Sequence, residues 1–193
     1  MNREFRILLF VISSLLMVSC GGEVIPKPKG MLRLSYPEPI YKKVELPCPY
    51  TFEKNEFSDL RKARRNKNCW YDLDYKRLRA TLYISYFEVG NNLDSLLRDA
   101  QNLTQEHFIK ADGITQEPYI DAENKVYGMF YEVTGDAASQ SQFYLTDSVQ
   151  HFVVGSIYFR AKPNYDSILP AADYLRNDMK HLIESLRWDE EYK

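Results

Sequence analysis

Apolar and polar residues alternate along much of the C-terminal half of this chain, in runs that short polar turns separate. Alternation with a period of two predicts strands that bury one face. Four such runs follow one another, at Ile114–Ile120, Lys125–Thr134, Gln140–Thr146 and His151–Arg160. Because they lie at hairpin spacing, we expect an antiparallel meander.

Strand patterns also occur in the N-terminal half. Met31–Tyr36 alternates and ends at Pro37, since proline cannot donate to a ladder. Tyr50–Glu53 can start a second short strand, and Leu78–Val89 has the clearest strand pattern of the chain. Between these two, Asn55–Asn68 is polar and basic, which predicts an exposed loop or a short helix.

Two segments have helical periodicity instead. Their apolar positions are Leu93, Leu96, Leu97, Ala100, Leu103 and Phe108 in the first segment, and Leu175, Met179, Leu182 and Leu186 in the second. This spacing places the apolar side chains on one face of each helix. Asn91 and Asn92 are N-cap candidates for the first helix, and Gly113 is predicted to close it. Pro170 is predicted to lie in the first turn of the second helix.

The order of these elements predicts the fold class. Strands, a helix, four antiparallel strands and a final helix are typical of an α+β fold, with two helices packed on an antiparallel β-sheet. The arrangement resembles the Mog1/PsbP-type α/β/α sandwich, and such a fold carries no function by itself. We expect residues 31–193 to form a single α+β domain.

The first 20 residues have the pattern of a secretory signal. Two arginines precede the apolar run Leu8–Val18, which is shorter than the ~20 residues that span a membrane. Cys20 follows at the position of a lipobox cysteine. We therefore expect residues 1–19 to be a lipoprotein signal peptide, Cys20 to carry lipid, and residues 20–30 to form a tether rich in proline and lysine. The alternatives are a secreted protein cut near Ser19, or an uncleaved anchor.

The charge and the aromatic content of the chain restrict the classes of function that it can have. The formal net charge is −2, which argues against a nucleic-acid binder. The 15 tyrosines and 10 phenylalanines suit a sheet whose faces are partly buried and partly wet. A basic cluster within the polar segment is a candidate interaction loop, although such a run is usually only a solvated face. It contains Arg61, Lys62, Arg64, Arg65 and Lys67.

Two cysteines remain if Cys20 carries lipid. In an oxidising periplasm an isolated pair such as Cys48 and Cys69 predicts a disulfide. Closing a loop of this length stabilises a fold by ~3 kcal/mol in the chain-entropy model. A metal site is the weaker alternative because no histidine lies at ligand spacing, and a nucleophile lacks a local base.

The sequence contains no strong signal for catalysis. His107, His151 and His181 have no carboxylate or cysteine at a motif spacing. Glu88 and Glu132 lie at predicted strand ends and could form a carboxylate pair. No phosphate-binding, dinucleotide-binding, zinc-protease or hydrolase motif occurs. We therefore expect no catalytic residue, no metal site and no cofactor.

Several short motifs along essentially the whole mature chain resemble one family. They are Pro26–Gly30, Leu32–Leu34, Tyr36–Pro37, Cys48-Pro49-Tyr50-x-Phe52-Glu53, Cys69–Trp70 and Ala80–Tyr86. Together they resemble the gliding-motility lipoprotein GldD family of Bacteroidetes. The basic residues from Arg61 to Lys67 depart from what we recognise of the family pattern.

This resemblance implies a function and a location. It implies a non-enzymatic envelope lipoprotein that gliding motility and the linked type IX secretion machinery require, and that acts by protein–protein contacts in assembly or stability. Its partners would be other envelope proteins of that machinery, and the membrane through the N-terminal lipid. The domain would face the periplasm, with the outer membrane favoured over the inner. The alternatives are a glycan- or peptidoglycan-binding envelope module, suggested by the tyrosines and the basic cluster, and a cryptic enzyme.

Overall fold

The computed structural model describes residues 35–64, 67–105, 111–160, 165–189 and 192. The predicted signal peptide, Cys20, the tether and most of the predicted strand Met31–Tyr36 lie outside these residues. The chain divides into two units, Met1–Gly30 and Met31–Lys193, and the description below concerns the second unit.

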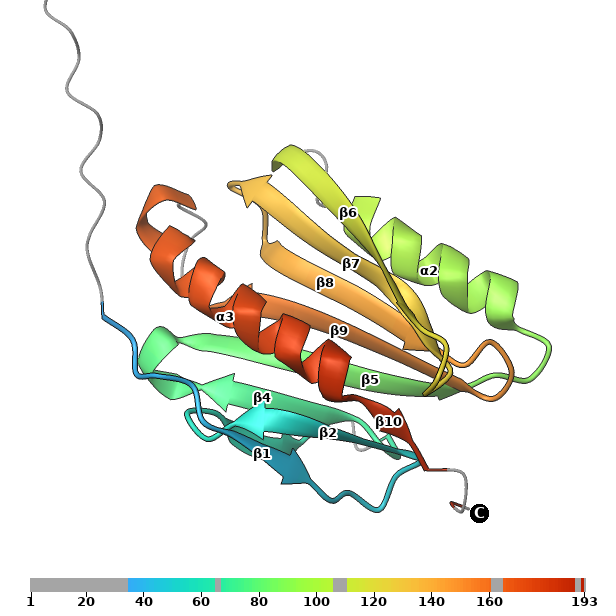
Figure 1. Ribbon diagram of the computed structural model, residues 1–193. Helices are drawn as coiled ribbons and strands as arrows, with labels where there is room; N and C mark the ends of the chain where they lie inside the picture. Colours follow the sequence, from blue (N-terminus) through green and yellow to red (C-terminus); the bar gives the residue numbers. More distant parts are fainter. Residues whose placement is uncertain (1–34, 65–66, 106–110, 161–164, 190–191, 193) are drawn as a thin grey trace, which may run out of the picture. The chain divides into compact units, whose positions relative to one another are not determined.

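A seven-stranded antiparallel sheet forms the centre of this unit (Figure 1). Its spatial order is β3-β4-β5-β9-β8-β7-β6. The strands are β3 (Asp59–Lys62), β4 (Tyr71–Tyr75), β5 (Ala80–Glu88), β6 (Ala111–Asp121), β7 (Val126–Gly135), β8 (Ser139–Thr146) and β9 (His151–Phe159). The chain crosses from β5 to the far edge at β6 and returns as a meander, which places β9 beside β5. The four predicted C-terminal strands and their antiparallel order are confirmed.

A smaller sheet brings the two ends of the described chain together. It contains β1 (Tyr41–Val44), β2 (Tyr50–Asn55) and β10 (Arg187–Trp188), in the order β1-β2-β10. Trp188 pairs with Tyr50, and Arg187 pairs with Thr51. A short helical turn, η1 (Lys76–Leu78), joins β4 to β5. The strand β10 was not predicted, because two residues are too few to carry a periodic pattern.

The two predicted helices are present, with corrections at their ends. Helix α2 (Leu93–Gln105) is not closed by Gly113, which lies in β6 beside an irregularity in the β6–β7 register. Helix α3 (Tyr165–Ser185) begins earlier than predicted, so Pro170 lies inside it and not in its first turn. The Asp136 carboxylate accepts a hydrogen bond from the Tyr165 backbone N–H at 2.8 Å. This cap comes from a distant strand end, so no local sequence signal reveals it.

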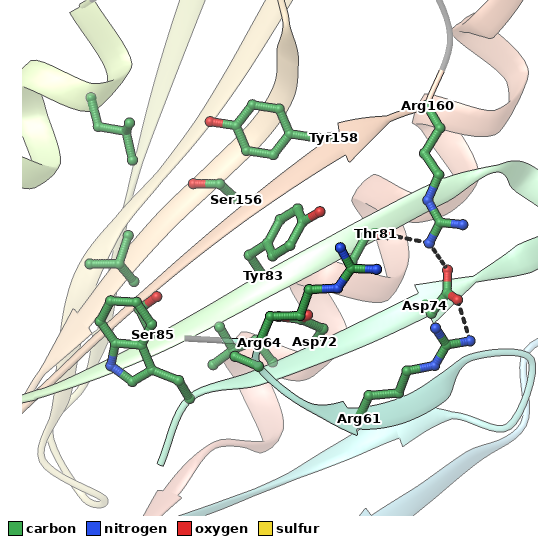
Figure 2. Close-up of a pocket in the computed structure, with 15 residues that line it drawn as sticks. Arg61, Arg64, Asp72, Asp74, Thr81, Tyr83, Ser85, Ser156, Tyr158 and Arg160 are labelled. Carbon is green, nitrogen blue, oxygen red and sulfur yellow. Dashed lines mark hydrogen bonds and ion pairs between the residues drawn. The ribbon is translucent and has the colours of Figure 1, made fainter. Parts of the chain in front are cut away.

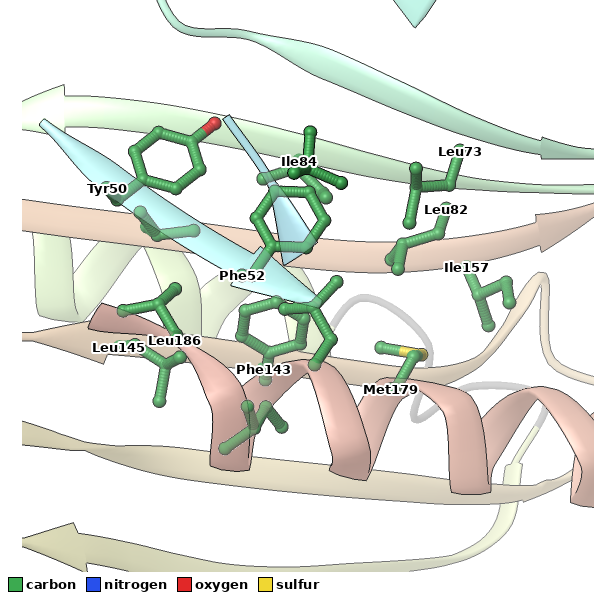
Figure 3. Close-up of a cluster of buried hydrophobic side chains, with 14 of the residues drawn as sticks. Tyr50, Phe52, Leu73, Leu82, Ile84, Phe143, Leu145, Ile157, Met179 and Leu186 are labelled. Carbon is green, nitrogen blue, oxygen red and sulfur yellow. The ribbon is translucent and has the colours of Figure 1, made fainter. Parts of the chain in front are cut away.

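The helices cover opposite faces of the large sheet. Figure 1 shows α3 in front of the sheet and α2 behind it. On the α3 face, the buried side chains of Leu82, Ile84 and Ile157 pack with those of Phe52 and Met179 (Figure 3). On the α2 face, buried residues include Ala100 of the helix and three side chains of β7 and β9. These three are Tyr131, Val133 and Phe152. The fold is therefore the predicted α+β architecture, with an antiparallel sheet between two helical layers.

Gly155 in β9 is a close-packed point of the α3-face core. A Cβ atom there would lie 2.1 Å from the Cε1 atom of Phe143 in the neighbouring strand. We expect Gly155→Ala to lower the free energy of unfolding by about 1–3 kcal/mol, since the buried ring must move. Urea unfolding measures this loss. Gly90→Ala is the matched control because a Cβ there meets nothing within 4 Å. An unchanged Gly155→Ala protein would contradict the packing described here.

Candidate functional site

A cavity of about 910 Å³ opens on the α2 face of the large sheet (Figure 2). Side chains at every second position of a strand point to the same face of the sheet. Alternate residues of several strands therefore line this cavity. Asp72 and Asp74 come from β4, and Thr81, Tyr83 and Ser85 come from β5. Further lining residues come from β3, β9, the end of α2 and the segment after β3. We refer to this site as the α2-face cavity.

A buried carboxylate with two arginine partners lies at one end of the cavity. The Asp74 side chain is only 2% exposed, whereas those of Arg61 and Arg160 are about half exposed. The Arg61 Nη2 atom lies 2.6 Å from Asp74 Oδ2, and Arg160 forms an ion pair with the Oδ1 atom of Asp74. Arg160 also donates a hydrogen bond to the Thr81 hydroxyl at 2.9 Å. These contacts tie the edge strand β3 to the centre of the sheet and hold two guanidinium groups at the cavity.

Asp72 and Arg64 form the second charged part of the cavity. Burial raises the pKa of the Asp72 carboxyl, while the positive charges of Arg61 and Arg64 oppose that rise. Arg64 is exposed and makes no ion pair with any described residue. The cavity thus holds three guanidinium groups against two carboxylates, and its balance is positive.

Aromatic rings form much of the remaining wall. The Trp70 indole N–H donates to the backbone carbonyl of Tyr86 at 2.7 Å, which fixes the ring beside the cavity. The Lys67 Nζ atom lies 4.8 Å from the centre of the Trp70 ring. Tyr83 is 44% exposed and meets Tyr158 edge to face, with ring centres 5.8 Å apart. The wall therefore combines apolar ring surface with phenolic hydroxyls.

Ser156 of β9 contributes a polar group to the lining. The residue is 5% exposed, and its hydroxyl oxygen finds no hydrogen-bond partner among the described residues. Figure 2 shows Ser156 next to Tyr158 on the cavity side of the sheet. Buried hydroxyls are normally hydrogen-bonded, so this group requires an explanation.

The predicted basic cluster divides between several environments. Arg61 and Arg64 line the α2-face cavity, whereas Lys62 is the next residue of β3 and therefore points to the other face. Lys67 lies over Trp70, and Arg65 is outside the described residues. The prediction of a loop or short helix here was wrong for Asp59–Lys62, which pairs with β4 as an edge strand. The strand β3 lacks the apolar alternation that would have indicated a strand. An ion pair from Arg61 to Asp74 of β4 helps to hold it at the edge of the sheet instead.

Cys48 and Cys69 belong to the buried core that contains Tyr50 and Phe52. Cys48 and Cys69 are joined by a disulfide, with Cα atoms 5.5 Å apart. Both residues are buried, at 1% and 6% exposure. The Tyr50 hydroxyl donates to the backbone carbonyl of Cys69 at 2.8 Å. The bridge therefore connects the start of β2 to the residues just before β4.

The structure does not bring the other titratable candidates into one site. His151 shares a 2.9 Å hydrogen bond with the Tyr86 hydroxyl, and burial lowers the pKa of the imidazole. His181 belongs to α3, and its Nε2 atom lies 2.7 Å from a carboxylate oxygen of Glu53 in β2. Glu132 is bound by Arg176 of α3, and Glu88 lies at the far end of another strand, so they form no pair. His107 lies outside the described residues.

No group of three histidine, cysteine, aspartate or glutamate side chains in the described ranges is arranged to hold a metal ion. Helices long and apolar enough to cross a membrane are likewise absent from the described part of the chain. Five residues that line the cavity were not predicted as site residues: Thr81, Tyr83, Ser156, Tyr158 and Arg160. Polar residues at alternate positions of β5 and β9 were the available signal, and only the pairing of these two strands makes them neighbours.

Comparisons with known proteins complete the description of the chain. No curated protein matches it. Among solved structures it is similar to the solution structure of cyanobacterial PsbP (CyanoP) from Synechocystis sp. PCC 6803, at 9% sequence identity and a TM-score of 0.48. That similarity covers 88% of this chain and 97% of the cyanobacterial chain. The model of the gliding motility lipoprotein GldD family matches residues 21–188. Since this match spans most of the sequence, the chain belongs to the gliding motility lipoprotein GldD family.

Proposed function

We propose that this protein is a non-enzymatic envelope lipoprotein that supports assembly or stability of the gliding machinery and of the linked type IX secretion apparatus. The observation that carries the proposal is the family match over residues 21–188. In this proposal Cys20 carries the lipid, and the domain faces the periplasm from the outer membrane. It acts by protein–protein contacts with other envelope proteins of the machinery.

The exposed edge strand β6 supports a role in protein contacts. It has 11 residues, and among the described strands only β7 pairs with it. Most of its residues are exposed, and Ile120 reaches 73% exposure. An edge of this kind presents free backbone N–H and C=O groups, which another chain can pair with. Pro118 within β6 cannot donate a backbone hydrogen bond, so it limits uncontrolled pairing along the full length of the edge.

We include no catalytic step in the proposal. The Asp74 carboxylate has an arginine on each oxygen, so both of its oxygens are already engaged. The imidazoles of His151 and His181 interact with a tyrosine and a glutamate on other parts of the fold, and neither of them lines the α2-face cavity. The GldD family is itself described by gliding motility and not by an enzyme activity.

The test compares two exposed apolar positions in cells that glide. We expect tagged wild-type protein to co-purify with gliding and type IX secretion proteins, and Ile120→Lys to reduce that recovery by ~10-fold, because a buried charge at an interface costs at least 1.4 kcal/mol. Val149→Lys is the matched control, since Val149 is 68% exposed in the turn before β9. Quantitative mass spectrometry of the eluates and spreading on agar give the two readouts.

Two results would count against this proposal. Equal recovery with both lysine variants would place the contact away from the β6 edge. Normal gliding in a deletion strain, with no machinery protein recovered by the wild-type bait, would overturn the accessory role itself. Immunoblots of the whole envelope keep the comparison at equal protein level.

The α2-face cavity favours a second candidate, a glycan-binding envelope module. An exposed tyrosine ring, hydroxyl groups and positive charge line one hollow on the sheet. The lining residues come from α2, from β3, β4, β5 and β9, from the segment between β3 and β4, and from Arg160 just after β9, so none comes from β6. A ligand in the cavity and a protein on the β6 edge would therefore use separate surfaces.

A further inference from the structure

We propose that the α2-face cavity binds a saccharide that carries a carboxylate group, such as a uronic acid unit of an anionic glycan. This inference rests on the second candidate function and is independent of the β6 contact. Three features of the cavity lead to it: a positive charge balance, an exposed tyrosine face, and polar groups that match sugar hydroxyls.

The three arginines of the cavity indicate that its ligand carries negative charge. Arg61 and Arg160 share one carboxylate, Asp74, and each side chain remains about half exposed. Arg64 makes no ion pair with a described residue, and its guanidinium lines the same cavity. A guanidinium presents N–H groups in a planar fork that matches a carboxylate. The Arg64 charge acts on Asp72 through the cavity, but no ion pair to a described residue occupies its guanidinium, which can therefore bind a ligand carboxylate.

The two tyrosines of the cavity indicate that its ligand contains a sugar ring. Tyr83 is 44% exposed, and Tyr158 supports it edge to face from the neighbouring strand. A rigid aromatic face with a polar tip packs against the C–H face of a pyranose while its hydroxyl remains wet. A simple inorganic anion needs no such surface. An extended acidic peptide would be expected at a sheet edge, and the edge strand beside this cavity, β3, has only four residues.

Polar groups of the cavity account for the hydroxyls of a sugar. Asp72 can accept hydrogen bonds, and Ser85 can donate or accept them. Ser156 is the sharpest indication, because its buried hydroxyl has no partner among the described residues. A ligand hydroxyl that reaches the floor of the cavity would supply that partner, and the cost of the unpaired group would then be recovered on binding.

The experiment uses full-length lipidated protein in detergent and isothermal titration calorimetry. The probes are trigalacturonic acid, neutral maltotriose, inorganic phosphate and the peptide acetyl-Glu-Glu-Glu-amide. We expect binding of trigalacturonic acid, and a loss of affinity of ~10-fold in Tyr83→Ala and in Arg64→Gln. Tyr192→Ala, at 47% exposure, and Lys43→Gln in β1 are the matched controls, and both should retain the wild-type affinity.

Ser156→Ala gives a second and independent readout. Removal of an unpaired buried hydroxyl should raise the melting temperature of the free protein, while the affinity for trigalacturonic acid should fall. A variant that was merely damaged would lose stability and affinity together. The opposite signs of the two changes therefore identify a hydroxyl that is kept for a ligand.

Several outcomes would overturn the inference. Equal affinity for maltotriose would remove the carboxylate requirement, and binding of phosphate or the peptide unaffected by Tyr83→Ala would make the cavity a site of another class. Absence of binding by every probe would exclude an acidic-sugar site. Each of these results leaves the co-purification experiment untouched, so the accessory role would stand or fall separately.

Discussion

Replacement of Asp178 by leucine is expected to lower the free energy of unfolding by about 3–5 kcal/mol, because it leaves several buried donors without an acceptor. Asp178 belongs to α3 and is 5% exposed. The Tyr41 hydroxyl donates to its carboxylate at 2.8 Å, and the Asn55 amide donates to both oxygens at 3.0 and 3.1 Å. Tyr75 of β4 forms a further hydrogen bond to it. One carboxylate thus connects the small sheet, the large sheet and α3.

Denaturant unfolding followed by circular dichroism measures this loss. Asp173→Leu is the matched control on the same helix, since the Asp173 side chain is 48% exposed and, among the described residues, forms an ion pair only with Arg176 three residues on. We expect that control to change stability by less than about 1 kcal/mol. A similar small change in Asp178→Leu would mean that the buried hydrogen bonds contribute little.

The same carboxyl makes stability depend on pH. Burial raises the pKa of Asp178 above its usual 3.8, and hydrogen bonds from Tyr41 and Asn55 only partly offset that rise. The folded state therefore holds this proton to higher pH than the unfolded state does. The contribution of the protonated form is full below about pH 3.8 and is lost as the pH rises through the folded pKa. The stability difference between wild type and Asp178→Asn should accordingly shrink between pH 4 and pH 7. A difference that grows over this range would contradict the raised pKa.

Loss of the Cys48–Cys69 disulfide is the second change with a large expected effect. Cys48→Ala and Cys69→Ala should each lower the free energy of unfolding by about 2–5 kcal/mol, the usual range for a native disulfide in a small exported domain. The bridge closes a loop with a sequence separation of 21 residues that contains β2 and β3. Without it, the unfolded chain gains freedom, and the carbonyl that Tyr50 binds is no longer fixed by a covalent link.

The double variant distinguishes one shared bond from two separate packing effects. If a single bond is lost in all three variants, the double variant should be only slightly less stable than either single variant. Reduced wild-type protein serves as the control without a substitution. Fully additive losses would indicate that the two side chains matter by packing alone. Peptide mapping of protein purified from the cell envelope without reductant should recover the two cysteine peptides linked, and two free thiols would contradict the bridge.

Much of the fold followed from periodicity. The meander and both helices carry strong patterns, because each buries one continuous face. The predictions were incomplete or wrong for elements that contacts between distant parts of the chain hold in place. β10 depends on pairing with Tyr50, and β3 is held by the ion pair between Arg61 and Asp74. The start of α3 depends on Asp136, which is 29 positions away in the chain.

The candidate site was less accessible to sequence reasoning than the fold. The basic residues Arg61 and Arg64 stood out because a charge cluster is visible in one stretch. The carboxylate partner of Arg61 did not stand out, because Asp74 meets its second partner, Arg160, only in the folded sheet, across 86 positions of sequence. Tyr83 and Ser156 become neighbours through the register of β5 with β9. That pairing requires the crossing from β5 to the opposite edge, which no local pattern specifies.

The order of the strands also determines when this domain can fold. The central pair β5–β9 joins residues that lie about 70 positions apart. The strand β2 pairs with β10, which comes much later in the sequence. Contacts of such long range are slow to form, because loop closure precedes the gain from pairing. In the export route that the proposed function implies, the N-terminal part of the chain would emerge before β9 and β10, the strands that complete the central sheet and the small sheet. Folding would then be left to the compartment in which the Cys48–Cys69 disulfide forms.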